Sequence, residues 1–264
     1  MLELKGIKKT FHKGTLNEKV ALDLEDFKIN DGDFVSVIGG NGAGKSTLMN
    51  IISGTLLPDE GTITLDGVDV TMLSEHKRAK FLGRVFQDPI MGTAANMQIE
   101  ENLALAKRRG EKRGFGWGIT KAEREEYKKL LKDFDLGLED RLTSKVGLLS
   151  GGQRQALTLI MATLKKPKVL LLDEHTAALD PKTSAKVMGL TEKLVKENEL
   201  TTLMITHNMA NAIEYGNRLI LMQSGKIIYD VSGEEKAKLT VKDLLDKFSD
   251  TAKELVNSDK VMLG

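Results

Sequence analysis

A glycine-rich segment that ends in a lysine and a serine is the part of the chain best suited to hold phosphate. It lies between the apolar runs 34–38 and 48–52 and reads Gly39-Gly40-Asn41-Gly42-Ala43-Gly44-Lys45-Ser46-Thr47. Glycines let a loop wrap closely with its N–H groups pointing inward, and the helix behind it adds unpaired N–H groups and a positive dipole end. Lys45 can reach the outer phosphates of a nucleotide, and Ser46 can offer a hydroxyl to Mg²⁺. The order strand, loop, helix predicts a P-loop rather than an ordinary glycine-rich turn.

Two adjacent carboxylates, Asp173 and Glu174, follow the nearly continuous apolar stretch 168–172. In a parallel sheet, ligands bind at the carboxyl ends of the strands. Asp173 can hold Mg²⁺ there, directly or through water, and Glu174 can orient an attacking water or accept its proton. Two solvated surface acids are the alternative. The P-loop argues against it, because hydrolysis of a nucleoside triphosphate needs such an arrangement.

A second segment, Leu149-Ser150-Gly151-Gly152-Gln153, opens a predicted helix. Small residues at a helix start can bind an anion, although a simple N-cap is the alternative. One chain with one P-loop then has two helix ends that favour phosphate, on different lobes. If two chains shared nucleotides head to tail, each of these helix ends would contact a phosphate group.

The elements that must position these residues alternate between strands and helices. Apolar and β-branched runs predict strands at Met1–Ile7, Val20–Ile29, 34–38, Gly61–Leu65, Arg84–Phe86, 168–173, Thr201–Thr206, Leu219–Met222 and Lys226–Tyr229. Helices are expected after the P-loop as far as Gly54, from Ser74 to Leu82, and over Pro181–Glu197 with Asp180 as N-cap. The alternation predicts a mainly parallel sheet with helices on both faces.

The alternation of predicted strands and helices stops at about residue 89 and resumes at about residue 167. Between them the periodicity predicts helices at 99–106, 121–134 and 150–165 and no strand. A basic, glycine-rich loop, Arg108–Trp117, lies between the first two and is either an exposed loop with docked aromatics or a contact surface for a partner. The charged region 232–264 is expected to hold two short helices, 241–248 and 251–256. The predicted division is a nucleotide-binding core over 1–88 and 167–231, a helical subdomain over 89–166, and an appendage over 232–264.

The composition is balanced in charge and lacks cysteine. The 264 residues include 39 Lys and Arg against 38 Asp and Glu, for a net charge of +1, and no Cys. Charge alone therefore does not favour nucleic acid or an anionic membrane, and neither disulfides nor thiolate metal sites are available. No signal peptide and no apolar run of membrane-spanning length is present, which predicts a soluble chain that serves any membrane process peripherally.

With these motifs in this order, the chain resembles the ATP-binding cassette (ABC) family over nearly all of residues 1–230. The resemblance implies that 39–47 is the Walker A loop, that 169–173 is Walker B, and that Leu149–Gln153 is the signature, which acts in trans on the partner's ATP. It identifies Gln87 with the Q-loop glutamine, Glu174 with the catalytic glutamate, and His207 with the switch histidine. Ala178-Leu179-Asp180 matches the D-loop.

The resemblance also implies the fold class and the ligands. The fold is α/β, a P-loop NTPase core with a mainly parallel sheet, an antiparallel β subdomain and an inserted α-helical subdomain. ATP and Mg²⁺ are the implied ligands, with Lys45, Gln87, Glu174 and His207 as catalytic residues, and Ser46, Gln87 and Asp173 at the metal. The implied nucleotide-binding set is Phe11, Gly39, Gly40, Asn41, Gly42, Ala43, Gly44, Lys45, Ser46, Thr47, Ser150, Gly151, Gly152, Gln153 and Asp180.

Phe11 stands where the family usually places an aromatic side chain that stacks on adenine, and His12 or Val20 could share that task. One departure is visible, because His175 occupies the position after the catalytic glutamate, where the family usually has proline. The stretch 173–180, the segment 87–93 and the basic loop together look like the ATPase subunits of a bacterial import group associated with tryptophan- or tyrosine-type solutes.

The implied function is hydrolysis of ATP by a dimer that drives solute transport through separate permease chains, with a solute-binding protein as a further partner and no nucleic acid. The expected location is cytoplasmic, peripheral on the inner face of the membrane. A non-transport ABC ATPase acting on nucleic acid or ribosomes is the main alternative, and the absence of a long heptad run and of a second cassette disfavours it. A small-molecule kinase is disfavoured by Leu149–Gln153, and a purely regulatory nucleotide-binding module by Glu174 and His207.

Overall fold

Two β-sheets and a group of helices make up the computed structural model, which describes residues 1–111, 118–134 and 136–248. One sheet has the strand order β10-β9-β3-β8-β7-β6, and the other has the order β2-β1-β4-β5. The strands are β1 Leu2–Phe11, β2 Lys19–Ile29, β3 Phe34–Gly39, β4 Glu60–Leu65, β5 Val68–Asp69, β6 Leu82–Val85, β7 Val169–Asp173, β8 Thr202–Ile205, β9 Arg218–Gln223 and β10 Lys226–Ser232.

The six-stranded sheet carries the P-loop and both carboxylates. Its neighbours β3, β8, β7, β6 and β9 pair in parallel, and only the edge strand β10 is antiparallel. Strand β3 is buried along its whole length and β7 over its first four residues, as expected for strands covered on both faces. The predicted mainly parallel sheet is therefore confirmed, and the carboxyl ends of β3, β7 and β8 lie together at one edge.

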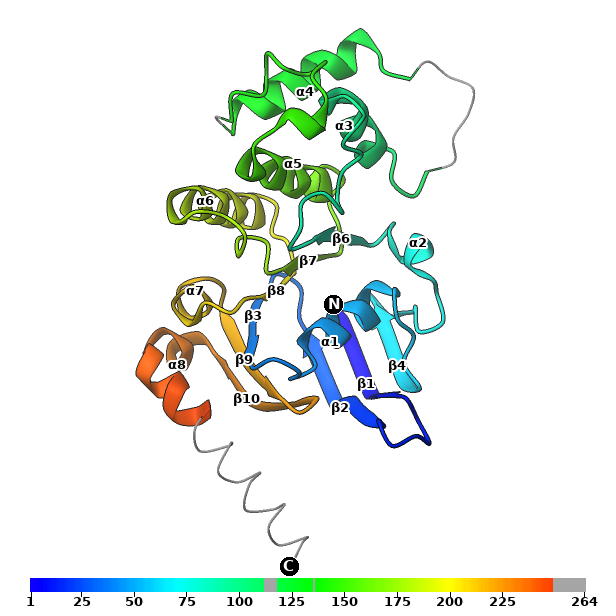
Figure 1. Cartoon of the computed structure of the whole chain (residues 1–264), viewed down its shortest axis with the longest axis vertical. Coiled ribbons are helices and arrows are strands. Elements are labelled where there is room, and N and C mark those ends of the chain that lie inside the picture. Colours follow the sequence, from blue (N-terminus) through cyan, green and yellow to red (C-terminus); the bar gives the residue numbers. More distant parts are fainter. Residues whose placement is uncertain (112–117, 135, 249–264) are drawn as a thin grey trace, which may run out of the picture.

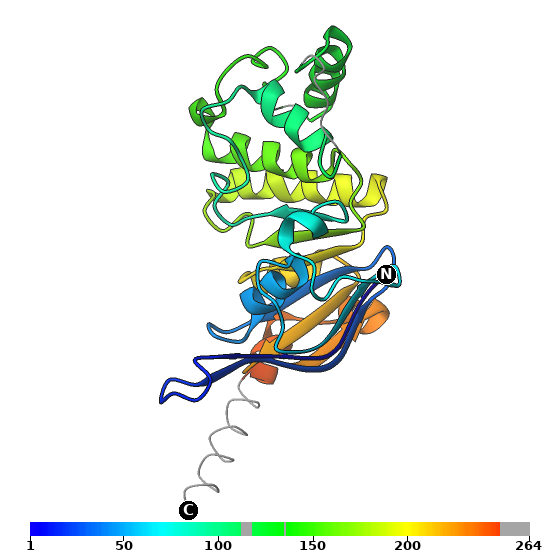
Figure 2. The same ribbon diagram turned by 90° about the vertical axis from the view of Figure 1, so that its right-hand side faces the viewer.

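The four-stranded sheet is antiparallel and contains the long β1–β2 hairpin. Leu2, Leu4 and Ile7 of β1 are buried and pack into the same core as α1 and β3. The tip of this hairpin extends away from the rest of the molecule (Figure 2). The hairpin brings Phe11, at the end of β1, opposite Lys19.

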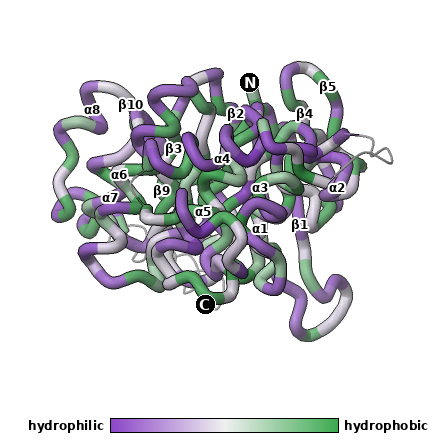
Figure 3. Tube along the Cα trace, turned by 90° about the horizontal axis from the view of Figure 1, so that it is seen from above, coloured by the Kyte–Doolittle hydropathy of each residue, from purple (hydrophilic) through white to green (hydrophobic). Residues whose placement is uncertain are grey.

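The remaining elements are helices, of which α3, α4 and α5 lie at the end of the molecule away from the sheets, whereas α1, α2, α7 and α8 lie beside the strands (Figure 1). Their bounds are α1 Lys45–Ser53, α2 Glu75–Arg78, α3 Ile99–Lys107, α4 Lys121–Lys132, the 3₁₀ turn η1 Val146–Leu148, α5 Gly151–Thr163, α6 Pro181–Glu197, α7 Met209–Glu214, α8 Gly233–Ala237 and a further helix over 241–248. Helices α3, α4 and α5 share a hydrophobic core of their own, and α6 lies between them and the sheets (Figure 1). Hydrophilic residues dominate α4, which buries Tyr127 and Leu131 (Figure 3).

Several predicted boundaries were wrong. The helix expected from Ser74 to Leu82 ends at Arg78, because the Arg78 side chain turns inward and donates to the carbonyls of Ile51 (2.6 Å) and Ile52 (2.9 Å) at the end of α1. Helices α7 and α8 are present but were not predicted. Of the two appendage helices, 241–248 is confirmed, whereas 251–256 lies outside the described residues, as does most of the basic loop, 112–117.

Candidate nucleotide site

A cavity of about 480 Å³ gathers most of the residues singled out from the sequence. It is lined by the loop 41–47 together with Phe11, Lys19, Ala21, Gln87, Glu174 and His207. Among the candidates for an adenine contact, Phe11 lines the cavity, whereas His12 and Val20 are not among its lining residues. Lys19 and Ala21 were missed by the sequence analysis. Only the pairing of Lys19 with Phe11 across the β1–β2 hairpin could have indicated them.

The loop before α1 requires glycine for steric reasons. Gly44 is the N-cap of α1 and has φ +100°, a left-handed conformation that disfavours other residues. A Cβ at this position would also lie 2.6 Å from the carbonyl oxygen of Ala21. The loop is therefore pressed against β2, with the start of α1 at the cavity. The unpaired N–H groups of the first helical turn there can bind an anion.

The Lys45 side chain is held inside its own loop. It is 5% exposed, and its Nζ donates to the carbonyl oxygens of Gly39 (2.8 Å) and Gly40 (3.1 Å). Burial lowers the pKa of Lys45, and the nearby charges of Glu174 and Asp173 oppose that shift. The ammonium group therefore lies at the cavity in a fixed position, and it can exchange carbonyl partners for phosphate oxygens.

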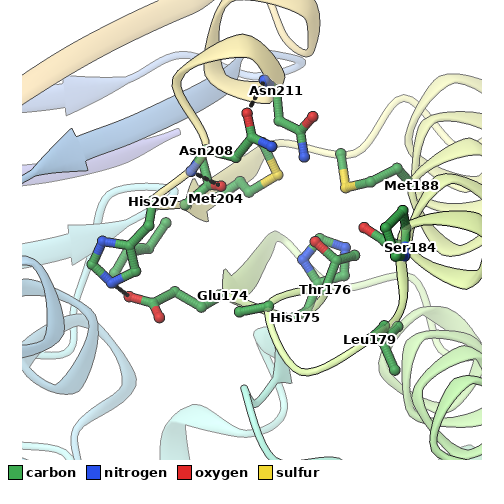
Figure 4. A pocket seen from close by; sticks show the side chains of 14 residues that line it. Glu174, His175, Thr176, Leu179, Ser184, Met188, Met204, His207, Asn208 and Asn211 are labelled. Atoms are coloured by element: carbon green, nitrogen blue, oxygen red, sulfur yellow. Dashed lines mark hydrogen bonds and ion pairs between the residues drawn. The ribbon is translucent and has the colours of Figure 1, made fainter. Parts of the chain in front are cut away.

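Glu174 and His207 face each other across the ends of two paired strands. Because Asp173 of β7 pairs with Ile205 of β8, both side chains leave the sheet at the same level. The Glu174 amide donates to the Ile205 carbonyl (3.0 Å), and Glu174 has φ +47°, which turns its side chain toward the cavity. Its Oε1 lies 2.5 Å from His207 Nε2 (Figure 4). Glu174 is 12% exposed and His207 is 48% exposed, so the glutamate is the more enclosed partner.

Asp173 lies beside this cavity and makes an ion pair that the sequence analysis missed. Its Oδ2 is 3.5 Å from Arg84 Nη2, which also donates to Asn50 Oδ1 (2.8 Å) of α1. Arg84 Nη1 donates to Ser53 Oγ at 3.0 Å. An arginine within the otherwise apolar strand β6 was the only signal in the sequence. Asp173, Arg84 and Gln87 line a second cavity of about 670 Å³, so Gln87 lies between the two.

His175 is buried and held by α6. It is 2% exposed, and its Nε2 is 3.0 Å from Thr191 Oγ1. The Thr191 hydroxyl donates to the Val187 carbonyl (2.9 Å), so the histidine ring donates to Thr191 through Nε2–H. Burial lowers the pKa of His175 to about 4, which keeps the ring neutral at neutral pH. Its side chain lies on the α6 side of the strand end, away from the Glu174 carboxylate (Figure 4).

The segment 149–153 lies apart from the P-loop cavity within this chain. Ser150 accepts from the Gln153 amide and Gln153 Oε1 accepts from the Ser150 amide, both at 3.2 Å, which forms the capping box of α5. A Cβ on Gly152 would overlap the methyl group of Thr183, so a larger residue there would require the Thr183 side chain of α6 to move. Ser150, Gly152 and Gln153 line a third cavity of about 680 Å³.

Asp180 caps α6 at the edge of the same region. Its Oδ1 accepts from the Thr183 amide at 3.1 Å, and hydrogen bonds from Thr183 lower the pKa of Asp180. Asp180 and the start of α5 thus lie together. Of the predicted nucleotide-binding residues, Gly39 and Gly40 belong to the P-loop but do not line its cavity. Five others are not brought to the P-loop cavity of their own chain: Ser150, Gly151, Gly152, Gln153 and Asp180.

The donor set around the P-loop suits a hard cation. Ser46, Gln87 and Asp173 offer hydroxyl, amide and carboxylate oxygens, the ligands that Mg²⁺ prefers. In the described part of the chain, no three His, Asp or Glu side chains are grouped to hold a metal ion. Mg²⁺ commonly takes one or two protein ligands and completes its shell with phosphate and water. Within the described ranges, no helix has both the length and the apolar character needed to cross a membrane.

Comparison with known proteins identifies the family. The family described as ABC transporter matches residues 22–177. The chain is 47% identical over 253 residues to the tyrosine transport ATP-binding protein of Clostridioides difficile (strain R20291), covering 94% of this chain and 98% of that protein. It is 33% identical to the methionine import ATP-binding protein MetN of Corynebacterium efficiens, covering 86% of this chain and 61% of that protein.

Solved structures agree with this result. The dimeric post-hydrolysis structure of the ATP-binding cassette MJ0796, bound to ADP and Pi, has a TM-score of 0.74 and 31% identity, covering 88% of this chain and 98% of that chain. The ABC transporter cassette MJ1267 has a TM-score of 0.76 and 29% identity, covering 94% of this chain and 98% of that chain. These matches confirm the resemblance and the fold class inferred from the motifs. The chain therefore belongs to the ABC transporter family, as an ATP-binding subunit with the ATPase activity of that family.

Proposed function

We propose that two copies of this chain bind two ATP molecules at a shared interface and that their hydrolysis drives import of a small organic solute. The observation that carries the proposal is the separation of the two phosphate-binding features within one chain. Glu174 and His207 line the P-loop cavity, whereas Ser150 and Gly152 line another. A second copy placed head to tail supplies the missing half of each site. The dimeric MJ0796 structure supports such an arrangement.

Each side chain then has a defined task. Lys45 exchanges its bonds to Gly39 and Gly40 for bonds to the outer phosphates, and the N–H groups at the start of α1 bind the same oxygens. Glu174 orients the attacking water and accepts its proton, while His207 holds the Glu174 carboxylate in place. The signature amides of the partner chain stabilise charge that develops on the transferred phosphoryl group.

The metal belongs to the same proposal. Ser46, Asp173 and Gln87 are the residues that would hold Mg²⁺, directly or through water. Mg²⁺ held there would supply positive charge that offsets the negative charge of the phosphates. Arg84 holds the Asp173 carboxylate through their ion pair. Phe11, which lines the cavity and is 36% exposed, would stack on the base.

Separate permease chains are the proposed membrane partners. The second cavity is lined by Phe86, Gln87, Pro89 and Met91. Met91 is 70% exposed, and its neighbour Ile90, which does not line the cavity, is 53% exposed. Exposed apolar side chains next to a cavity are typical of a protein contact. A permease that docks there would contact Gln87 and couple transport to the nucleotide site. The subunit would then lie at the cytoplasmic face of the membrane, beneath its permease.

The solute proposed is an aromatic amino acid of the tyrosine type, delivered by a solute-binding protein. The support is the 47% identity, over nearly the whole of both chains, to a tyrosine transport ATP-binding protein. The test is affinity capture of the tagged chain from gently solubilised membranes, followed by identification of the copurifying chains. A polytopic permease and a binding protein whose ligand is tyrosine are expected. Recovery with ribosomes or DNA and without a membrane chain would refute transport.

The dimer is tested with Glu174→Gln. This change removes the proton acceptor but keeps the P-loop, so the variant should bind ATP and accumulate as a dimer in sedimentation velocity experiments. The variant without nucleotide and the double variant with Lys45→Ala are the controls, and both should stay monomeric. If Glu174→Gln remains monomeric in saturating ATP and Mg²⁺, the head-to-tail arrangement is wrong.

The functional division that we propose uses the domain boundaries predicted from the sequence. The nucleotide-binding core over 1–88 and 167–231 hydrolyses ATP, and the helical subdomain over 89–166 presents the signature to the partner. The separate hydrophobic core of α3, α4 and α5 supports this division.

A further inference from the structure

Lys236 is buried although it carries a charge. This residue of α8 is 3% exposed, and its Nζ donates to the carbonyl oxygens of Ile213 (2.7 Å), Tyr215 (2.9 Å) and Gly216 (2.7 Å). An ammonium group has three N–H donors, so these carbonyls account for all of them. Burial lowers the pKa of Lys236 to about 8, and the ammonium form still prevails at neutral pH. The ammonium group is thus bound entirely by backbone carbonyls of another segment of the chain.

The three carbonyls lie at the carboxyl-terminal end of α7. The last carbonyls of a helix have no partner inside the helix, and a cation there also faces the negative end of its dipole. Helix α7 has six residues, so on the order of 9 Å separates its ends. A helix this short depends on its caps, because it has few internal hydrogen bonds. Lys236 therefore holds α7 at one end.

The other end of α7 leads directly to the nucleotide site. Asn208 is its N-cap and accepts from the Asn211 amide at 3.1 Å, and His207 immediately precedes Asn208. His207 Nε2 in turn contacts Glu174 Oε1. A shift or tilt of α7 would thus move the histidine relative to the glutamate. Lys236 does not line the P-loop cavity, and α7 is the element that connects its carbonyl partners to His207.

Apolar packing joins the same elements. Ala212 of α7 and Leu244 of helix 241–248 are both fully buried in one cluster. Ile38, which directly precedes the P-loop glycines, belongs to that cluster. Residues 233–248 of the appendage therefore pack on α7 from the side while Lys236 holds its end.

We propose that Lys236 is a positioning residue for ATP hydrolysis, which acts by holding α7 and so keeping His207 against Glu174. The segment 233–248 then takes part in the hydrolytic step without touching the nucleotide. This inference rests on the role proposed above for the pair of Glu174 and His207.

The test is a double-mutant cycle of Lys236→Met and His207→Ala in the full-length chain, with kcat and KM for ATP measured at saturating Mg²⁺. Misplacement by a fraction of an ångström to 1 Å can cost up to about a hundredfold in rate, so Lys236→Met should lower kcat by roughly tenfold to a hundredfold. The KM for ATP should change by less than about twofold, because the P-loop is untouched. Lys238→Met, an exposed change one residue beyond α8, is the matched control and should leave both constants unchanged.

The cycle separates positioning from a general folding defect. If Lys236 acts through His207, Lys236→Met should lower kcat by less than about twofold in the His207→Ala background. An equal loss in both backgrounds, or no loss in the wild-type background, would overturn the inference. If His207→Ala itself leaves kcat unchanged, the proposed role of the pair is wrong instead. Should Lys236→Met not fold, Lys236→Gln, which keeps a side-chain donor, takes its place in the same cycle.

Discussion

Acidification should destabilise the protein through a single buried histidine. His175 has a pKa of about 4 in the folded chain, against an ordinary value of 6.5 in the unfolded chain. The unfolded state therefore binds a proton that the folded state excludes, so the stabilisation is complete above pH 6.5 and is lost as the pH falls toward 4. The full difference amounts to about 3 kcal/mol of unfolding free energy. Between pH 7 and pH 5 the His175 contribution to this loss is about 2 kcal/mol.

Urea unfolding at pH 7, 6 and 5 measures this effect, with His175→Gln as the reference. Glutamine has a similar size and an amide N–H that can donate to Thr191, but it does not titrate. All other titrating groups are common to both chains. The unfolding free energy of the wild type minus that of the variant should therefore fall by about 2 kcal/mol from pH 7 to pH 5. Parallel pH profiles would refute the reasoning, since they would mean that protonation of His175 costs nothing in the folded state.

Two further changes test the nucleotide site. Lys45→Ala removes the buried ammonium group, so the ATP dissociation constant in a calorimetric titration should rise by about thirtyfold, the equivalent of one charge-assisted contact of about 2 kcal/mol. Unchanged affinity would contradict the P-loop assignment. Arg84→Met should lower the unfolding free energy by about 2 kcal/mol, because Asn50 and Asp173 lose a shared, half-buried partner. Exposed Lys77→Met is the control for that urea measurement, and equal unfolding midpoints for the two variants would exclude a structural role for Arg84.

The P-loop and the strand carboxylates could be predicted because their order along the chain carries the information. An apolar run, closely spaced glycines and a Lys-Ser pair define strand, loop and helix within about fifteen consecutive residues. The conformation of the loop then follows from local sterics. His207 was singled out through the resemblance to the ABC family, and the sheet topology explains why it lies beside Glu174. Both follow buried strands, and parallel strands end at the same edge of a sheet.

What the sequence analysis missed depends on contacts between distant residues. Arg84 and Asp173 are 89 positions apart, and nothing in the spacing of β6 indicates that its arginine points toward β7. The partner of His175 is Thr191, in the middle of a helix where threonine carries no signal of its own. Helix α7 has only six residues, which is too short for periodicity to reveal it, and its caps come from Asn208 and from the distant Lys236. Helix α2 likewise ends earlier than predicted because Arg78 contacts residues that are distant in the sequence.

The parallel pairing of β7 with β8 also determines which mutations the site can tolerate. Leu172 faces Met204 and Asp173 faces Ile205, so the lengths of these strands set how far Glu174 and His207 extend from the sheet. One inserted residue in either strand would shift the pair by about 3.3 Å and turn the side chain to the opposite face. Insertions and deletions there should abolish activity even where single substitutions are mild. Changes of length should instead be tolerated in the exposed turn between β1 and β2.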